Sequence, residues 1–163
     1  MLGNNENNIS TIRLAGIVEE SIVDGDGIRF AIFVQGCTHK CKGCHNTHTH
    51  DKNGGEVYNI SELCARIKTN PLLAGVTFSG GEPFLQAGAL CSIAKFVKSI
   101  GQNVWCYSGY TLEELQRLAQ KNTDIAELLS LVDTLVDGPF IQEQKDLTLK
   151  FRGSKNQRII KLR

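Results

Sequence analysis

Short apolar segments alternate with helical patterns along most of this chain, and this order constrains the fold more than any other sequence feature. Strands are expected over the apolar segments 12–18, 28–34, 75–79, 103–107 and 134–137. Helices are expected from Ser61, over about 84–100, from Thr111 and over about 124–131. Because a helix that connects two neighbouring strands makes them parallel, the order predicts a mostly parallel α/β sheet with right-handed crossovers.

Local signals support the helix boundaries. Thr111 is followed three residues later by Glu114, which is the capping-box pattern of a helix start. Pro83 suits a first helical turn, where its missing N–H removes no hydrogen bond. Pro71 ends the region in which the helix from Ser61 can continue.

The length of 163 residues predicts a single domain over 1–163, in which residues 1–11 are expected to be flexible. A complete eight-stranded barrel, which takes ~250 residues, is excluded. The formal net charge of +1 gives no reason to expect a nucleic-acid partner. No apolar run reaches the ~20 residues that cross a membrane, and Met1–Ser10 has no signal-peptide pattern. We therefore expect a cytoplasmic protein with no membrane partner.

Each of the polar and glycine-rich motifs directly follows an expected strand. They are the loop from Cys37 to Cys44, Gly80-Gly81-Glu82, Ser108-Gly109-Tyr110 and Asp137-Gly138-Pro139. In parallel α/β folds, ligands bind at the carboxyl ends of the strands. Four separate stretches are therefore expected to converge on one site.

Cys37, Cys41 and Cys44 lie within one run of eight residues and have no nearby fourth cysteine. A ferredoxin-type cubane is held by four thiolates, and a structural zinc site also has four ligands. Three thiolates on a cubane would leave one iron open to another ligand. The remaining cysteines fall within helix or strand patterns and are interpreted as core residues: Cys64, Cys91 and Cys106.

Two other interpretations of the three cysteines stay open on the local pattern. A nearby histidine could complete the four ligands of a zinc-binding module, with His39, His45, His48 and His50 as the candidates. A non-enzymatic iron–sulfur electron carrier would instead need a fourth cysteine at a matching spacing. His48 and His50 are most simply interpreted as exposed loop residues.

Gly80-Gly81-Glu82 suits a ligand that carries an amine and a carboxylate. The glycines permit close approach of the backbone, and Glu82 can accept charged hydrogen bonds from an ammonium group. A simpler interpretation is a strand-to-helix turn in which an acidic residue complements the helix dipole. Beside the three cysteines, the ligand interpretation is favoured.

Several of these motifs together resemble a known family. Cys-x3-Cys-x2-Cys followed by Gly-Gly-Glu-Pro at a strand end resembles the radical S-adenosylmethionine superfamily. Asp24-Gly25-x-Gly27-Ile28-Arg29 resembles the activases of glycyl radical enzymes, although Asp26 stands where proline is usual. The stretches 105–110, 135–140 and 151–158 are similar to the activases that serve anaerobic ribonucleoside-triphosphate reductase. The resemblance extends over about residues 16–163.

The resemblance implies an incomplete parallel β/α barrel of the radical S-adenosylmethionine type. It implies that Cys37, Cys41 and Cys44 bind three irons of a [4Fe-4S] cluster, whose fourth iron takes S-adenosylmethionine. The residues implied to contact S-adenosylmethionine are Gly43, Cys44, His45, Gly80, Gly81 and Glu82. No catalytic side chain is implied beyond the cluster ligands.

The implied reaction is the reductive cleavage of S-adenosylmethionine to methionine and a 5′-deoxyadenosyl radical, which takes a hydrogen from a glycine of the large reductase subunit. A one-electron donor protein is implied as a second partner. The alternatives are an activase of pyruvate formate-lyase and a small radical enzyme of deazapurine synthesis. The last fourteen residues carry six basic side chains, which are interpreted as an exposed tail or edge strand, or as a docking segment.

Overall fold

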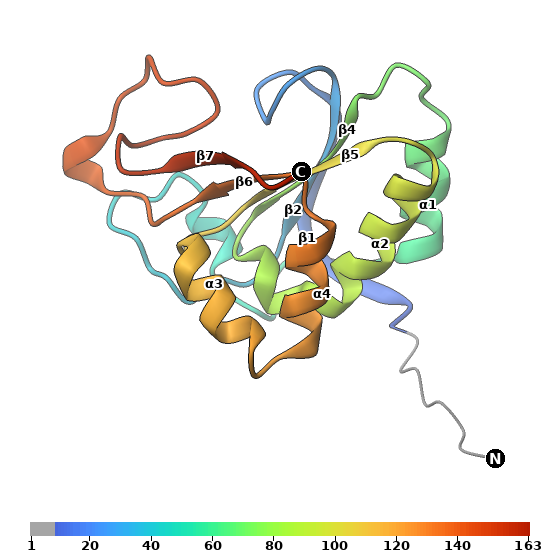
Figure 1. Cartoon of the computed structure of the whole chain (residues 1–163), viewed down its shortest axis with the longest axis horizontal. Helices are drawn as coiled ribbons and strands as arrows, with labels where there is room; N and C mark the ends of the chain where they lie inside the picture. The colour runs from blue at the N-terminus through green and yellow to red at the C-terminus, as the bar shows by residue number, and fades with distance from the viewer. Residues whose placement is uncertain (1–8) are drawn as a thin grey trace.

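The computed structural model describes residues 9–163, which form one seven-stranded sheet in the order β3-β1-β2-β4-β5-β6-β7 (Figure 1). The strands are β1 Thr11–Ser21, β2 Arg29–Val34, β3 Glu56–Asn59, β4 Gly75–Gly80, β5 Asn103–Tyr107, β6 Thr134–Asp137 and β7 Arg158–Lys161. The pairs β2–β4, β4–β5 and β5–β6 are parallel, whereas β1–β2, β1–β3 and β6–β7 are antiparallel. The predicted parallel α/β centre is confirmed, and antiparallel strands extend it on both sides.

The antiparallel strands have local causes. No helix lies in the 22–28 connection, so β1 and β2 pair as a hairpin rather than as a parallel crossover. β3 and β7 are absent from the sequence prediction because each has four residues, mostly exposed, without an alternating apolar pattern. β7 confirms the edge-strand interpretation for Arg158–Lys161 of the basic C-terminal segment.

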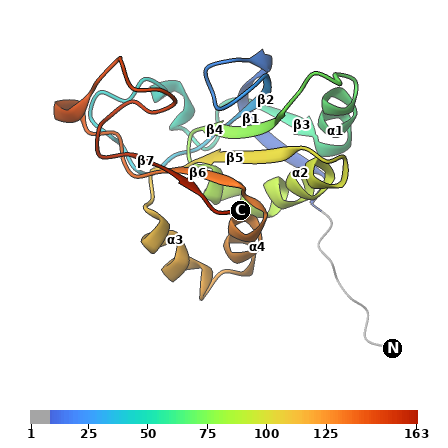
Figure 2. The ribbon, with the colours of Figure 1, turned by 45° about the horizontal axis from the view of Figure 1, so that its top comes forward.

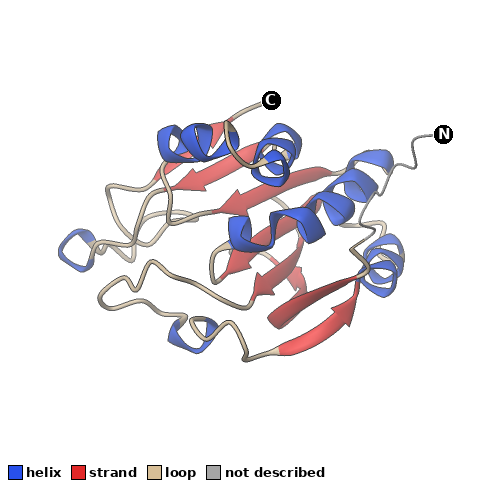
Figure 3. Ribbon diagram, turned by 90° about the horizontal axis from the view of Figure 1, so that it is seen from below, coloured by secondary structure: helices blue, strands red, loops and turns tan. Residues whose placement is uncertain are grey.

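Helices cover one face of the sheet (Figure 3). They are α1 Ile60–Lys68, α2 Ala87–Ser99, α3 Leu112–Ala119 and α4 Thr123–Leu131, and the 3-10 helices are η1 Thr47–Thr49, η2 Pro83–Gln86 and η3 Gln142–Gln144. The helix expected over 84–100 is divided into η2 and α2. Gln86 leaves helical geometry at φ −118° and ψ 36°, and its side-chain amide donates to the Gln35 carbonyl at 2.9 Å.

The helix starts follow their capping residues. The Thr111 hydroxyl accepts from the Glu114 N–H at 3.2 Å, and the Glu114 carboxylate accepts from the Thr111 N–H at 2.8 Å, so the capping box is confirmed. The sequence predicts that the first helix begins at Ser61, whereas α1 begins one residue earlier, at Ile60. Asn59 is the N-cap of α1, because its side-chain oxygen accepts from the Ser61 N–H at 2.9 Å.

Alternate residues of the central strands point to opposite faces of the sheet. The buried helix-facing side chains are Phe30, Ile32, Val34, Val76, Phe78, Val104, Cys106 and Leu135. The other face carries Phe33, Ser79 and Tyr107 at the carboxyl ends of β2, β4 and β5. That second face therefore presents the site, while the first forms the hydrophobic core.

Residues 1–8, which make up most of the segment expected to be flexible, lie outside the described residues, and Thr11 is the first residue of β1. Within residues 9–163, none of the helices has the length and apolar composition that a bilayer crossing requires.

Candidate active site

The loops that follow β2, β4, β5 and β6 meet at one end of the sheet, where the cysteine loop and the C-terminal segment lie on the same side (Figures 1 and 2). They line a cavity of about 150 Å³. Its lining includes Cys37, Cys41, Cys44, Gly80, Gly81, Ser108, Gly109, Gly138 and Phe140. The predicted convergence of the four strand-end motifs is confirmed.

The cysteine loop is held at its base by backbone hydrogen bonds. Gly36 turns the chain out of β2 with a φ of +101°, and its N–H donates to the Thr49 carbonyl at 2.6 Å. The Cys37 N–H donates to the His50 carbonyl at 3.2 Å. The His50 ring is half-buried, and its Nε2 has no hydrogen-bond partner among the described residues, so the expectation of an exposed His50 is wrong.

The three cysteines are free thiols of intermediate exposure on one cavity. Burial raises the pKa of the Cys37 thiol above its ordinary value. In the part of the chain that the structure describes, no three His, Cys, Asp or Glu side chains are arranged around a single metal ion. The donor set of three thiols fits an iron–sulfur cluster, whose usual ligands are thiolates.

Gly80 and Gly81 join the end of β4 to the backbone of β2 and the cysteine loop. Gly80 has a φ of +92°, and a Cβ added to it would lie 2.5 Å from the Val34 nitrogen. A Cβ on Gly81 would lie 2.2 Å from the Gly36 carbonyl oxygen, and the Gly81 N–H donates to the Val34 carbonyl at 2.8 Å. Glycine is therefore required at both positions because the end of β4 packs closely against the backbone of residues 33–36. Contact of these residues with S-adenosylmethionine stays a prediction.

Replacing Gly81 with alanine is expected to lower the free energy of unfolding by roughly 1–3 kcal/mol, because the new methyl group collides with backbone that cannot move aside alone. Gly16→Ala is the matched control, since a Cβ at Gly16 meets no atom within 4 Å. Urea unfolding of the cluster-free proteins measures both changes. Equal stability of the two variants would contradict this role for Gly81.

Glu82 is completely buried behind the two glycines. Its carboxylate contacts His39 Nε2 at 2.6 Å and accepts from the Ser108 hydroxyl at 2.9 Å and from the Gly109 N–H at 2.9 Å. As the N-cap of η2 it also accepts from the Phe84 N–H at 3.1 Å. The simpler interpretation of Glu82, as an acidic residue at the start of a helical turn, is therefore correct for one of its contacts. Acceptance of an ammonium group stays a prediction.

His39 is a site residue whose contact the sequence does not reveal. The hydrogen bond to Glu82 raises the pKa of His39 above its ordinary value, while burial acts in the opposite direction. The His39 ring packs edge-on against Tyr110, with 4.5 Å between ring centroids. Forty-three positions separate His39 from Glu82, and only the folded chain brings them together.

Three of the predicted ligand residues, Gly43, His45 and the buried Glu82, are not part of the cavity lining. Gly43 is exposed at a φ of +75°, and a Cβ there would lie 1.5 Å from Gln142 Oε1. His45 is exposed and packs edge-on against Phe140, with 5.5 Å between centroids. Since Phe140 does line the cavity, His45 lies one side chain away from it.

A larger cavity of about 580 Å³ lies on the sheet face opposite the helices. It shares Asn46, Ser79 and Tyr107 with the cavity of the cysteines, so the two are contiguous. Ile22 and Val23 lie at its rim and are 73% and 71% exposed. A continuous hollow therefore leads from the cysteines to the surface.

Comparisons with known proteins identify relatives of the chain. The family described as 4Fe-4S single cluster domain matches residues 23–160. The anaerobic ribonucleoside-triphosphate reductase-activating protein of Vibrio cholerae is 38% identical over 145 residues, covering 83% of this chain and 89% of that protein. The proteins of the same name from Escherichia coli K12 and phage T4 are 37% and 31% identical, covering 87% and 84% of this chain and 94% and 86% of their own lengths.

A solved structure, that of QueE from Escherichia coli, aligns with a TM-score of 0.52 at 18% identity. The match covers 67% of this chain and 59% of that chain, less than two thirds of its length, and it supports the fold alone. The sequence relatives, by contrast, match over 83–87% of this chain, and the cluster-domain family matches most of it as well. By that likeness, the chain belongs to the family of anaerobic ribonucleoside-triphosphate reductase-activating proteins.

Proposed function

We propose that this chain is the enzyme that activates anaerobic ribonucleoside-triphosphate reductase by generating a glycyl radical on its large subunit. The observation that carries the proposal is the single cavity lined by Cys37, Cys41 and Cys44 together with Gly80 and Gly81. Family membership supports the same reaction, since the relatives are named for that activation. It gives no support to a zinc-binding module or a simple electron carrier.

Cys37, Cys41 and Cys44 would hold three irons of a [4Fe-4S] cluster. When bound, the cluster supplies the electron that cleaves S-adenosylmethionine to methionine and a 5′-deoxyadenosyl radical. The backbone of Gly80 and Gly81 would bind the amino-acid end of S-adenosylmethionine. Glu82 would either accept from its ammonium group or hold the neighbouring turn, and Gly43 and His45 would approach it from the cysteine loop.

The larger cavity is the path by which the reductase would reach the reacting atoms. Its lining is mixed, with apolar surface from Phe33 and Phe151 beside the charged Asp24, Lys150 and Arg152. Transfer of one hydrogen atom from the glycine Cα would then give 5′-deoxyadenosine and leave the unpaired electron on the reductase. Tyr107 lies where the two cavities meet, and its hydroxyl is bound to the Phe151 carbonyl at 2.6 Å.

We also infer that the sheet is an incomplete barrel of the radical S-adenosylmethionine type. This is supported by the four parallel strands β2, β4, β5 and β6, the helices on one face and the cavities on the other. The one-electron donor protein, the cytoplasmic location and the lack of a nucleic-acid partner stay predictions.

The proposal is tested by mixing the reconstituted protein anaerobically with the large reductase subunit, a one-electron reductant and S-adenosylmethionine. A glycyl radical signal in electron spin resonance is expected on the reductase, with 5′-deoxyadenosine formed beside it. A reductase whose candidate glycine is replaced by alanine is the control and should give no such signal. Formation of 5′-deoxyadenosine without any radical on the reductase would mean that the substrate is a different protein.

A further inference from the structure

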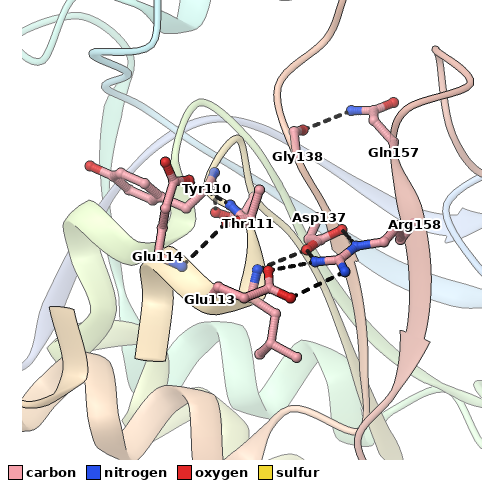
Figure 4. Close-up of polar contacts among 10 residues, drawn as sticks. Tyr110, Thr111, Glu113, Glu114, Asp137, Gly138, Gln157 and Arg158 are labelled. Atoms are coloured by element: carbon pink, nitrogen blue, oxygen red, sulfur yellow. Dashed lines mark hydrogen bonds and ion pairs between the residues drawn. The ribbon is translucent and has the colours of Figure 1, made fainter. Parts of the chain in front are cut away.

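Arg158, the first residue of β7, binds two carboxylates from two other elements (Figure 4). Its Nε and a terminal nitrogen contact the two carboxylate oxygens of Asp137, at the end of β6, at 3.0 and 2.5 Å. The terminal nitrogens also contact Glu113 of α3 at 2.8 and 3.2 Å. A guanidinium provides this planar set of donors, which an ammonium group lacks.

Asp137 is 1% exposed, so its charge depends on these contacts. Its carboxylate has one further partner, the Leu112 N–H at the start of α3, at 2.7 Å. Two backbone bonds flank this contact: Ser108 N–H to the Val136 carbonyl at 2.9 Å, and Gly138 N–H to the Tyr110 carbonyl at 3.0 Å. The turn 108–112 is therefore attached to the end of β6 by three hydrogen bonds, the middle one through Asp137.

The same turn holds Glu82 from its other side. Ser108 and Gly109 donate to the Glu82 carboxylate, and Tyr110 packs against the His39 ring. Ser108, Gly109 and Gly138 are also among the residues that line the cysteine cavity. A shift of the turn would thus move both the cavity lining and the acceptor behind it.

Arg158 remains charged under all ordinary conditions, because the hydrogen bonds to Asp137 and then to Glu113 raise its pKa above its ordinary value. Glu113 is largely exposed, so solvent screens its share of the pairing. The contact with buried Asp137 is the one that the local structure depends on.

We propose that Arg158 is a positioning residue, which through Asp137 fixes the turn 108–112 and thereby the shape of the S-adenosylmethionine site. The effect of Arg158 on the S-adenosylmethionine site rests on the proposed function, whereas its attachment of the turn 108–112 to β6 does not. Arg158 reaches the site only through other residues. Arg158, one of the six basic residues of the C-terminal segment, therefore stabilises the fold and is not available to bind a partner.

The first experiment uses the cluster-free full-length chain and so does not depend on S-adenosylmethionine chemistry. Amide hydrogen exchange of a peptide that spans 107–115 is compared between the wild type and Arg158→Gln. Exchange in this peptide is expected to speed up about tenfold, the scale of a lost coupling between neighbouring groups, while peptides of α1 and β1 stay unchanged. Arg66→Gln, which breaks an exposed Arg–carboxylate pair with Glu19, is the matched control and should leave the 107–115 peptide unchanged.

The second experiment measures S-adenosylmethionine affinity of the reconstituted protein. Arg158→Gln is expected to raise the dissociation constant about tenfold with iron content unchanged, a combination that general destabilisation would not give. Asp137→Asn combined with Arg158→Gln removes the unpaired buried charge and leaves an amide oxygen for the Leu112 N–H. The double variant should therefore recover part of the exchange protection and part of the affinity, and it also serves if the single variant folds poorly.

Unchanged exchange at 107–115 in Arg158→Gln would overturn the proposal, as would a uniform rise over the whole chain. Altered exchange with unchanged affinity would overturn the positioning role and leave a purely structural pair. If the wild type binds no S-adenosylmethionine, the proposed function fails, and the exchange result still decides whether Arg158 holds the turn.

Discussion

Replacing Cys41 with alanine is expected to lower the formation of 5′-deoxyadenosine by at least about 100-fold in the anaerobically reconstituted protein, because the cofactor carries the chemistry. The physical reason is the number of ligands. Cys37, Cys41 and Cys44 are the three thiols on the cavity, and a cluster with two protein thiolates would be bound weakly. Iron content and 5′-deoxyadenosine are measured on the same preparation.

Cys64→Ala is the matched control for this change. Cys64 is also a free thiol of intermediate exposure, but it lies in α1 and packs against the hydrophobic core. Its variant should keep its iron and its activity. Wild-type formation of 5′-deoxyadenosine by Cys41→Ala would contradict the assignment, and so would equal losses in the two variants.

Replacing Glu82 with alanine is expected to have the second-largest effect, because it lowers both the free energy of unfolding and the affinity for S-adenosylmethionine. The free energy of unfolding of the cluster-free protein should fall by roughly 2–4 kcal/mol, since several buried donors lose a charged acceptor at once. The donors are His39, Ser108, Gly109 and Phe84. S-adenosylmethionine binding should weaken while iron content stays near normal, because Glu82 is not a cluster ligand.

Urea unfolding and equilibrium binding separate these two effects. Glu62→Ala removes an exposed glutamate from the first turn of α1 and should change stability by less than about 0.5 kcal/mol. Glu82→Gln keeps the size of the side chain and should lose less stability than Glu82→Ala. Loss of iron in the Glu82 variants, with unchanged S-adenosylmethionine affinity of the protein that keeps its cluster, would show that the residue supports only the cysteine loop.

The strands β2, β4, β5 and β6 could be predicted because buried parallel strands are continuous apolar runs bounded by turn residues. The edge strands β3 and β7 could not, since short exposed strands carry no such pattern and form where a neighbour offers hydrogen bonds. The break at Gln86 was equally hidden, because its side chain is bound to the backbone of Gln35, fifty-one residues earlier in the chain.

For the site, the sequence by itself determined the chemistry that is available. Three thiols in one short loop and glycine-rich turns after successive strands are local properties, and the parallel order alone places them at one edge. Only the tertiary structure decided which groups touch. Glu82 accepts from His39 and Ser108, and Asp137 is paired with Arg158, because the packing of the strand-end loops brings these side chains against the two buried carboxylates. Such pairings join residues far apart in the chain, and no local pattern encodes their distances.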